Sequence, residues 1–438
     1  MDSIVDVVIP TFRPDERLLR ILEGMAAQTV RPRLVRIINT QKDGFDAFLK
    51  AQGFAEATSA DTKAREEASG AEGTRASEEA PGYAAGDMPQ EEGPSAAEAA
   101  FRSRFPFAEI THIRKEEFDH GGTRNRGFRM CEGADYVLTM TQDAMPADTM
   151  LIGRLLDALQ TGTEPIAAAA DPAAAEPAGS DDRKTSAGDV GARMPADSGA
   201  GNSCGGSSAV RERAEEAPSG DDNEHIMTGE PSPGKMSCAP PGAIAVAYAR
   251  QLPNIDAPVE ERLSREFNYP AQSRAKSEAD RDDLGIKTYY CSNVCAMYRM
   301  DIWRELNGFP ERAIFNEDMI YACKALRAGY RTYYAAQAQV YHSHNYTASQ
   351  QFHRNFDLGV SQAQNPQVFG GLSSEGEGVS YVKAVIGWMM AEHEALRVPG
   401  FVWRCAARLV GYRLGKAYEK LPVSWAAAFS SNKGYWNV

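Results

Sequence analysis

A single carboxylate follows one of the most apolar segments of this sequence and is a candidate metal ligand. The run YVLTMT is followed directly by Gln142 and Asp143, and Pro146 comes shortly after. Mg²⁺ often takes only one or two protein carboxylates and leaves phosphate oxygens and water to complete its octahedron. Asp143 is therefore well placed to hold a divalent cation, and the alternative is that it only caps a turn.

Two histidines follow another apolar segment, in YHSHNYT. If this segment is a strand, His342 and His344 share one of its faces. Together with His353 they suggest a zinc site, but no cysteine pair and no HExxH sequence supports zinc. A histidine at a strand end is equally well explained as a structural residue whose ring nitrogens are hydrogen bonded within the protein.

An acidic pair opens the segment AIFNEDMIYACKALRAGY, which has the pattern of an amphipathic helix. Asn316 is a residue type that caps helices, and Glu317 and Asp318 complement the positive end of the helix dipole. The alternative is that one of the two acids faces a pocket and accepts a proton in a reaction. The local sequence is compatible with both interpretations.

A glycine-rich segment has the sequence FDHGGTRNRG. Gly121 and Gly122 let a ligand approach the backbone closely, and Thr123 can cap a following helix whose N-terminus attracts anions. Arg124 and Asn125 then come in the first turn, where a guanidinium can meet a diphosphate. The segment is not a P-loop, because the GxxxxGK[ST] spacing is absent, and a capped turn is an equally good interpretation.

Four residues at the end of the first apolar run, SIVDVVIP, form another candidate cluster: Pro10, Thr11, Phe12 and Arg13. An aromatic side chain at a strand end can stack on a nucleobase, and an arginine beside it can meet phosphate. An ordinary turn explains the same residues equally well.

These clusters fall at the ends of β-rich runs that alternate with helical runs. The predicted strands are SIVDVVIP, LVRIINT, AEITHIR, YVLTMT, AIAVAYAR and KTYYCSNVCAMYR. Amphipathic segments such as ERLLRILEGMAAQ, DTMLIGRLLDALQ (with Asp148 as its cap) and PVEERLSREFN lie between them. The alternation predicts an α/β fold with a mostly parallel sheet that helices cover on both faces. Such sheets bind ligands at the carboxyl ends of their strands, where the polar clusters fall.

The domain organisation follows from shifts in composition. Two stretches, residues 55–100 and 162–242 approximately, are rich in small and acidic residues and lack periodic large apolar ones. They cannot offset chain entropy by burial, so we expect mobile insertions in surface loops of a domain that spans residues 1–376. Residues 377–438 are helical, apolar and locally basic, which predicts a C-terminal helical extension. This extension can pack on the domain as a hairpin, rest on anionic lipid, or do both.

The composition excludes several classes of protein. About 43% of the residues are hydrophobic, which allows a large core, but no run reaches the roughly 18 to 20 apolar residues that span a bilayer. The start, MDSIVDVVIPTF, lacks the features of a signal peptide, and the seven cysteines include no CxxC pair. A net charge of -13 argues against binding to nucleic acid. We expect a cytoplasmic protein in which Cys291 and Cys295 are buried thiols of one apolar strand.

Taken in order, the motifs resemble those of family-two glycosyltransferases with the GT-A fold, and more narrowly the bacterial rhamnosyltransferases of surface-polysaccharide synthesis. The resemblance rests on VVIPTF, FDHGGTRNRG, MTQDAMP, FNYP, LGIKTYYCSNVCAMYR, NGFPERAIFNEDMIYACKALRAGY and VYHSHNYTASQQFHRNFDLGV. GYRLGKAYEKLP followed by SNKGYW is also similar to that subgroup. The resemblance covers nearly the whole chain outside the two insertions. The order of the motifs is specific to this group of enzymes, whereas the motifs indicate the transferred sugar less specifically.

The resemblance implies that the first half of the chain binds a nucleotide-sugar. The residues expected around this donor are Pro10, Thr11, Phe12, Arg13, Asn39, Gly122, Arg124, Asn125 and Gln142. Asn39 occupies the position of an acid that usually binds the nucleobase, and Asp43 follows further on. Asp143 matches the last carboxylate of the DxD metal motif, whose first position is Thr141 here, and His342 matches a histidine that completes the metal site. The implied cofactor is Mg²⁺ or Mn²⁺.

The resemblance also implies a reaction. Asp318 matches the second residue of an ED signature, the catalytic base, and Glu317 and Asn293 would bind or orient the acceptor. The implied enzyme is an inverting, metal-assisted transferase that moves L-rhamnose from dTDP-L-rhamnose to a growing, lipid-linked glycan. It would work at the inner face of the cell membrane, and the basic aromatic C-terminal helices suit contact with that membrane. Two alternatives stay open. One uses another nucleotide-sugar, such as a UDP-hexose, and the other is a non-catalytic glycan- or nucleotide-binding protein on the same fold.

Overall fold

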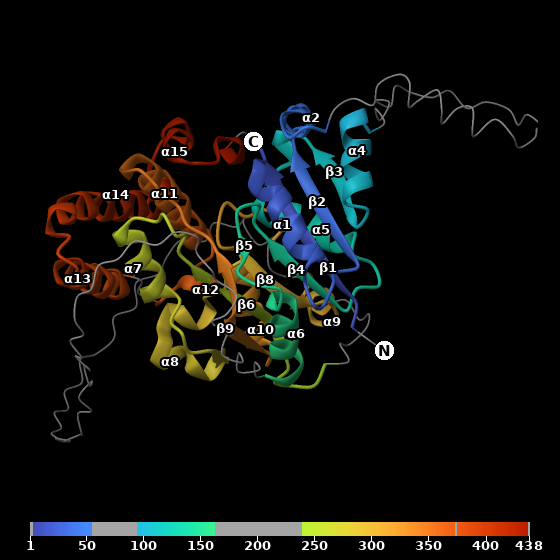
Figure 1. The fold of residues 1–438 in the computed structure, drawn as a ribbon. Coiled ribbons are helices and arrows are strands. Elements are labelled where there is room, and N and C mark those ends of the chain that lie inside the picture. Colours follow the sequence, from blue (N-terminus) through green and yellow to red (C-terminus); the bar gives the residue numbers. More distant parts are fainter. Residues whose placement is uncertain (1–2, 55–93, 163–238, 373–374, 437–438) are drawn as a thin grey trace, which may run out of the picture. The chain divides into compact units, whose positions relative to one another are not determined.

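The computed structural model describes residues 3–54, 94–162, 239–372 and 375–436 (Figure 1). Most of the two predicted insertions lies outside these residues. The end of the first insertion is described and forms α4 (Ala96–Arg104), so its predicted limit near residue 100 is wrong, because Ala97 and Phe101 pack into the core. The described residues belong to one compact unit of residues 1–166 and 233–438.

Among the described residues, nine strands form one sheet in the order β3-β2-β1-β4-β8-β6-β9-β5, with β7 paired to β9. The strands are β1 (Val5–Phe12), β2 (Leu34–Thr40), β3 (Ala108–Ile113), β4 (Tyr136–Met140), β5 (Met145–Pro146), β6 (Ile244–Leu252), β7 (Arg274–Lys276), β8 (Cys295–Arg299) and β9 (Arg331–Tyr341). The first four strands are parallel, as are β6 and β9. Strand β8 is antiparallel to β4 and β6, and β5 and β7 are antiparallel to β9. The predicted α/β fold is confirmed, with a sheet that is parallel in its first half and mixed in its second.

The predicted strand KTYYCSNVCAMYR is a strand only in its second half. Residues Gly285–Tyr289 form a 3-10 helix, and β8 begins at Cys295. The carbonyl of Lys287 in this 3-10 helix accepts a hydrogen bond from the N–H of Tyr290 at 3.1 Å, and the amine of Lys276 on β7 donates a second one to it at 3.0 Å. Cys291 therefore lies in the loop before β8, and both cysteines are buried free thiols as predicted.

Helices cover both faces of the sheet, as predicted, because the strands alternate apolar side chains between two cores. Val7 and Ile9 of β1 pack in a core with residues of α1, α2, α4 and α6, whereas Val8 packs in a core with residues of α5, α9 and α10. The helices before the C-terminal region are α1 (Glu16–Ala26), α2 (Lys42–Ala51), α5 (His120–Arg129), α6 (Leu151–Thr161), α7 (Val259–Asn268), α8 (Arg281–Leu284), α9 (Met300–Glu305) and α10 (Glu317–Arg327).

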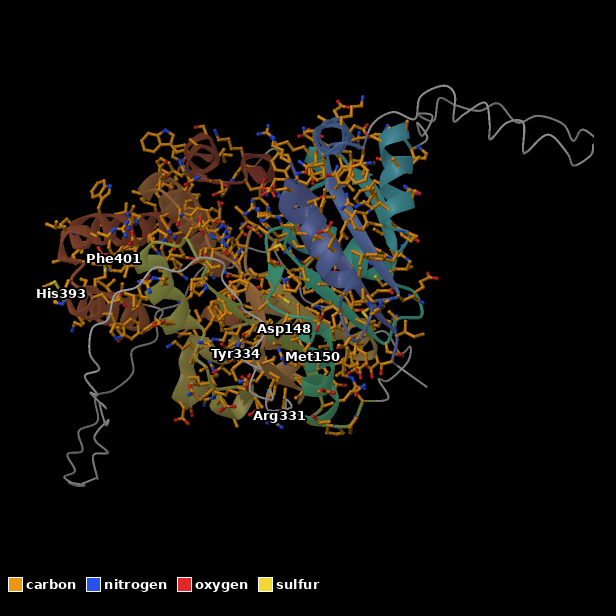
Figure 2. The ribbon with its side chains drawn as sticks, in the orientation of Figure 1. Asp148, Met150, Arg331, Tyr334, His393 and Phe401 are labelled. Carbon is orange, nitrogen blue, oxygen red and sulfur yellow. The ribbon has the colours of Figure 1, made fainter. Side chains whose placement is uncertain are left out.

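Helix α6 begins later than the segment DTMLIGRLLDALQ predicts. Met150, and not Asp148, occupies the N-cap position. The carboxylate of Asp148 accepts a hydrogen bond from the N–H of Met150 at 2.8 Å and pairs with Arg154 at 2.6 Å. Figure 2 labels Asp148 and Met150 in this stretch. The predicted cap is wrong because the chain forms a separate turn before the helix, and Asp148 stabilises that turn.

The C-terminal region is helical, as predicted, and its elements are α11 (Ala348–Gln364), α12 (Pro366–Phe369), α13 (Glu375–Ala391), α14 (Val398–Lys416) and α15 (Val423–Phe429). Helices α11 and α14 lie side by side (Figure 1). Their backbones approach closely because glycines face the neighbouring helix. A Cβ on Gly411 would lie 2.3 Å from the carbonyl oxygen of Phe352, and one on Gly415 would lie 2.1 Å from that of Phe356. Helices on both sides of residue 377 thus share one interface, and a domain boundary at that residue stays a prediction.

A search of the described part of the chain finds no helix with both the length and the apolar composition that crossing a bilayer requires.

Candidate active site

A cleft of about 640 Å³ opens where β4 and β9 end and where α10 begins. Asp143, His342, His344 and Asp318 all line it. Asp143 and the two histidines are far apart in the sequence and meet here because β4 and β9 end at the same edge of the sheet. Asp318 reaches this edge from the start of α10. Strand β8 is antiparallel to β4, so the residues before β8 lie at this edge, and Asn293 among them donates its N–H to Asp318. The expectation that polar clusters gather at the strand ends is confirmed for Asp143, His342 and His344.

Asp143, His342 and His344 form a cluster whose candidate ligand atoms all lie within 4.8 Å of one another. Nε2 of His342 is 3.6 Å from Oδ1 of Asp143, and Nε2 of His344 is 3.8 Å from its Oδ2. The register of the sheet produces this cluster. Strand β5 is antiparallel to β9 with Met145 opposite Tyr341, so the turn that carries Asp143 lies across from the residues that follow β9.

The cluster has the spacing and the donor atoms to hold a divalent cation. Ligand atoms about 2.1 Å from Mg²⁺ lie about 3 Å apart when adjacent and about 4.2 Å apart when opposite, so the observed separations leave room for an ion. Oε1 of Gln251 lies 2.9 Å from Nδ1 of His342, which places the ring hydrogen on Nδ1 and leaves the Nε2 lone pair facing Asp143. Burial lowers the pKa of His342 and lowers the pKa of His344 to about 4, so both rings are neutral at pH 7.

Asp318 is held by two backbone donors. Its Oδ2 accepts a hydrogen bond from the N–H of Asn293 at 3.0 Å, and its Oδ1 accepts one from the N–H of Met319 at 2.8 Å. Burial, followed by the neighbouring charge of Glu317, raises the pKa of Asp318 to about 7. A carboxyl group with such a pKa has both proton states at neutral pH and is suited to general base chemistry. The geometry favours the proton-accepting interpretation of FNEDM over capping alone.

Asn316 does not cap α10 through its side chain. It occupies the N-cap position with φ 63°, a left-handed conformation that Asn tolerates better than most residues. Its Nδ2 donates to Oγ of Ser361 on α11 at 3.2 Å, and its side chain accepts no hydrogen bond from the amides of the first turn. The predicted side-chain cap is wrong, because the residue has a left-handed backbone conformation in place of the extended one of an ordinary cap, and its side chain links the start of α10 to α11.

Glu317 lies beside the base in a buried hydrogen-bonded group. Its Oε1 is 3.1 Å from Nη1 of Arg124 and accepts a hydrogen bond from Nδ2 of Asn293 at 3.0 Å. The hydroxyl of Tyr298 donates in turn to Oδ1 of Asn293 at 2.6 Å. Burial alone would raise the pKa of Glu317, but Arg124, His120 and the Asn293 hydrogen bond together lower it. Glu317, Asn293 and Arg124 line the cleft, while their predicted contacts with acceptor and diphosphate stay predictions.

The predicted donor residues at the ends of β1 and β2 form a hydrogen-bonded row across the sheet. Thr11 lies opposite Asn39 in the register, and Asn39 lies opposite His112. Oγ1 of Thr11 donates to Oδ1 of Asn39 at 3.1 Å, and Nδ2 of Asn39 is 3.0 Å from Nδ1 of His112. Asn39 is 0% exposed. Neighbouring strands use its hydrogen-bonding groups in this structure, and its predicted contact with the nucleobase stays a prediction.

Phe12 is tied to the turn that carries Asp143. The N–H of Phe12 donates to Oε1 of Gln142, and Nε2 of Gln142 donates to the carbonyl of Phe12, both at 2.9 Å. The ring of Phe12 is 40% exposed, and the guanidinium of Arg13 lies 5.2 Å from its centroid. Pro10 is partly exposed just before them. Pro10, Phe12 and Arg13 are at least partly exposed, whereas the backbone of Phe12 uses the amide of Gln142. None of these four residues is among those that line the cleft, and their contact with the donor stays a prediction.

The segment FDHGGTRNRG is capped by Asp119 and not by Thr123. Oδ1 of Asp119 accepts hydrogen bonds from the N–H groups of Gly121 and Gly122, each at 2.9 Å. A Cβ on Gly121 would lie 1.9 Å from the carbonyl oxygen of Pro310, and one on Gly122 would lie 2.9 Å from the next carbonyl. Protein backbone occupies the space beside Gly122 and the carboxylate of Asp119 accepts from its amide, while its predicted donor contact stays a prediction.

Asn125 also has a structural role. It lies beyond the first turn of α5, is 0% exposed, and exchanges two 2.9 Å hydrogen bonds with the backbone of Phe309. Both ends of its amide hold the loop before α10, and its predicted contact with the donor stays a prediction.

One residue of the metal cluster, His344, and the residue that orients His342, Gln251, were absent from the predicted ligand set. His344 has a local signal, the HxH spacing after an apolar run. Gln251, which orients His342, has no local signal, because only the pairing of β6 with β9 brings it there. His353, which the zinc hypothesis included, lies elsewhere with its Nδ1 2.8 Å from the carbonyl of Phe429.

The sequence is similar to O-antigen chain rhamnosyltransferases, which confirms the predicted resemblance. RfbN of Salmonella typhimurium strain LT2 is 43% identical over 197 residues, which cover 44% of this chain and 62% of the relative. WbaN of Salmonella anatum is 42% identical over 197 residues with the same coverage of 44% and 62%. The chain therefore spans less than two thirds of the curated relatives that it matches. No protein-family model matches the sequence.

The solved structures to which the chain is similar at low sequence identity include a mannosyltransferase and TarS. The mannosyltransferase PcManGT from Pyrobaculum calidifontis, in complex with GDP-Man and Mn²⁺, has a TM-score of 0.44 and 10% identity, with 96% of this chain and 89% of that chain covered. TarS 1-349 of S. aureus has a TM-score of 0.36 and 10% identity, with 95% and 92% covered.

Proposed function

We propose that this protein is an inverting glycosyltransferase that moves L-rhamnose from dTDP-L-rhamnose to a growing cell-surface polysaccharide. The observation that carries the proposal is that Asp318 lines the same cleft as Asp143, His342 and His344. Transfer from a nucleoside-diphosphate sugar needs a base and a cation site, and here both face one cavity. The similarity to O-antigen chain rhamnosyltransferases supports the choice of rhamnose.

Asp318 accepts the proton of the acceptor hydroxyl while that oxygen bonds to the anomeric carbon. Attack on the face opposite the leaving diphosphate inverts the anomeric centre. Two backbone hydrogen bonds, from Asn293 and Met319, hold the carboxylate in place. Because the pKa of Asp318 is about 7, its ionised form is well populated at neutral pH and is a stronger base than an ordinary aspartate.

Asp143, His342 and His344 would hold a divalent cation whose remaining positions take water and diphosphate oxygens. When bound, the cation neutralises charge on the departing nucleoside diphosphate. We propose Mn²⁺ over Mg²⁺, because Mg²⁺ prefers oxygen ligands whereas this cluster offers two imidazole nitrogens and one carboxylate. Phe12, Arg13 and Arg124 are the proposed contacts to the nucleoside and the diphosphate.

We also propose that the protein works in the cytoplasm, in peripheral contact with the membrane that carries a lipid-linked acceptor. Apolar side chains on the C-terminal helices support this contact, since Leu396 is 98% exposed and Val410 is 52% exposed. The basic residues Arg397, Arg413 and Lys416 accompany them in the sequence, and such a combination suits an anionic bilayer surface.

A donor screen tests the proposed function. Thermal unfolding of the full chain would be followed with dTDP-L-rhamnose, UDP-glucose and GDP-mannose, each with Mn²⁺ or Mg²⁺. We expect the largest rise in Tm with dTDP-L-rhamnose and Mn²⁺. If UDP-glucose alone raises the Tm, the donor is a UDP-hexose and the assignment of dTDP-L-rhamnose is wrong.

A variant at the base completes the test. Asp318→Asn should abolish sugar transfer and keep the donor-induced rise in Tm, because the amide cannot accept the proton but fills the same space. Transfer by Asp318→Asn would remove Asp318 from the base role. If no nucleotide-sugar raises the Tm of the wild-type protein, the transferase proposal is wrong.

A further inference from the structure

A second groove, of about 490 Å³, adjoins the catalytic cleft. It lies between the start of α7, the segment 344–348, and helices α13 and α14. His344, Tyr346 and Gln351 line both the groove and the cleft. The two hollows therefore meet at the metal cluster, and a ligand that enters the cleft can extend into the groove.

Aromatic rings form much of the groove. Its aromatic residues beyond the histidine are Tyr346, Tyr381, Phe401 and Trp403. Trp403 on α14 is 68% exposed, although its large side chain is of a type usually well buried. Phe401, labelled in Figure 2, is 3% exposed and packs 5.9 Å from Tyr381, centroid to centroid. The groove thus has a fixed aromatic floor and one aromatic ring that solvent reaches.

The charged side chains that line the groove are two acids, Glu260 and Glu261, and two arginines, Arg404 and Arg408, so their charges sum to zero. Arg404 pairs with Glu260 at 2.6 Å, and Glu261 pairs at 2.8 Å with Arg265, which is on the same helix and outside the groove lining. The guanidinium of Arg408 lies 5.4 Å from the centroid of Tyr381. A phosphate site would carry a net positive charge. This lining offers balanced donors and acceptors beside aromatic faces, which suits a neutral ligand with many hydroxyl groups.

We propose that the groove binds neutral sugar units of the acceptor, next to the unit whose hydroxyl enters the cleft. The C–H face of a pyranose ring carries a slight positive potential and stacks on the negative face of an aromatic ring, and Trp403 offers such a face. The paired carboxylates and guanidiniums meet the hydroxyl groups at the ring edges. This inference rests on the proposed transferase function, and it adds a site that selects longer acceptors over single sugars.

The test compares acceptors of different length. Transfer by the full chain would be measured with a tagged neutral monosaccharide and with tagged neutral trisaccharides that end in the same sugar. We expect a larger kcat/KM for the trisaccharide, and we expect Trp403→Ala to lower the preference by roughly three- to tenfold, the scale of one aromatic contact. Trp403→Phe should keep part of the preference. Trp425→Ala is the matched control, since Trp425 is 58% exposed on α15 and lies outside the groove lining.

The outcomes separate this inference from the proposed function. If the wild-type protein transfers sugar to both acceptors with equal kcat/KM, the groove does not bind sugar and only the inference falls. The same holds if Trp403→Ala keeps the full preference, or lowers transfer equally with both acceptors. If the wild-type protein binds and transfers no nucleotide-sugar at all, the proposed function itself falls.

Discussion

Arg124 and Glu317 form a buried ion pair at 3.1 Å, with side chains only 7% and 8% exposed, and this pair joins α5 to α10. The pair fixes a negative charge beside Asp318. Because that charge opposes ionisation of a second carboxyl group, it adds to burial in raising the pKa of Asp318 to about 7. The positive charge of Arg124 keeps Glu317 ionised although its side chain is buried.

The first prediction concerns the pH dependence of sugar transfer. An ionised Asp318 is the active form, so kcat/KM should rise about tenfold per pH unit below pH 7 and level off above it. The variant Glu317→Gln removes the like charge, so the pKa of Asp318 should fall and the midpoint of the profile should move to lower pH. Profiles of kcat/KM against pH check both statements, with Glu392→Gln as an exposed control. A midpoint that stays in place or rises in Glu317→Gln would contradict the assignment.

The second prediction concerns His344, the candidate metal ligand that the resemblance did not include. His344→Ala removes one of three candidate ligands, so Mn²⁺ should bind at least roughly tenfold more weakly. Titration of free Mn²⁺ by electron paramagnetic resonance measures this affinity without any assay of activity. His353→Ala is the control, because His353 bonds to the carbonyl of Phe429 and lies outside the cluster. Equal Mn²⁺ affinities of the two variants would exclude His344 as a ligand.

The third prediction separates a structural asparagine from a donor contact. Asn125→Ala leaves the buried N–H and carbonyl of Phe309 without the amide partner, which should lower the free energy of unfolding by about 2 to 4 kcal/mol. Urea denaturation measures the loss. Gln160→Ala removes a hydrogen bond at the exposed end of α6, and its effect should stay within about 0.5 kcal/mol. A stable Asn125→Ala protein with weakened donor binding would support the predicted donor contact.

The fourth prediction concerns the glycine pair of FDHGGTRNRG. Gly121→Ala places a Cβ 1.9 Å from the carbonyl oxygen of Pro310, so the loop must move and the protein should unfold at a much lower urea concentration. Gly44→Ala in α2 is the matched substitution, because a Cβ there meets nothing within 4 Å, and it should raise the stability by about 0.5 to 1 kcal/mol. Normal stability of Gly121→Ala would show that the glycine is not needed for this packing.

The sequence by itself determined the alternation of strands and helices, the two-faced core and the strand-end position of Asp143. These features depend on residue periodicity and on short-range rules, which one segment carries within itself. The sequence also identified Asp318 as the candidate catalytic base, through a resemblance that extends over many motifs. It predicted buried thiols at Cys291 and Cys295 correctly, although only Cys295 lies on a strand.

Only the tertiary structure decided which polar groups remained available to a ligand. Asn39, Gly122 and Asn125 have residue types that suit a binding site. The neighbouring strand uses the side chain of Asn39, the helix cap Asp119 uses the amide of Gly122, and the loop before α10 uses the side chain of Asn125. Conversely, the antiparallel pairing of β5 with β9 brings His344 to Asp143. A buried polar group must find a partner, and distant segments supply that partner, so the local sequence cannot show which groups face the cleft.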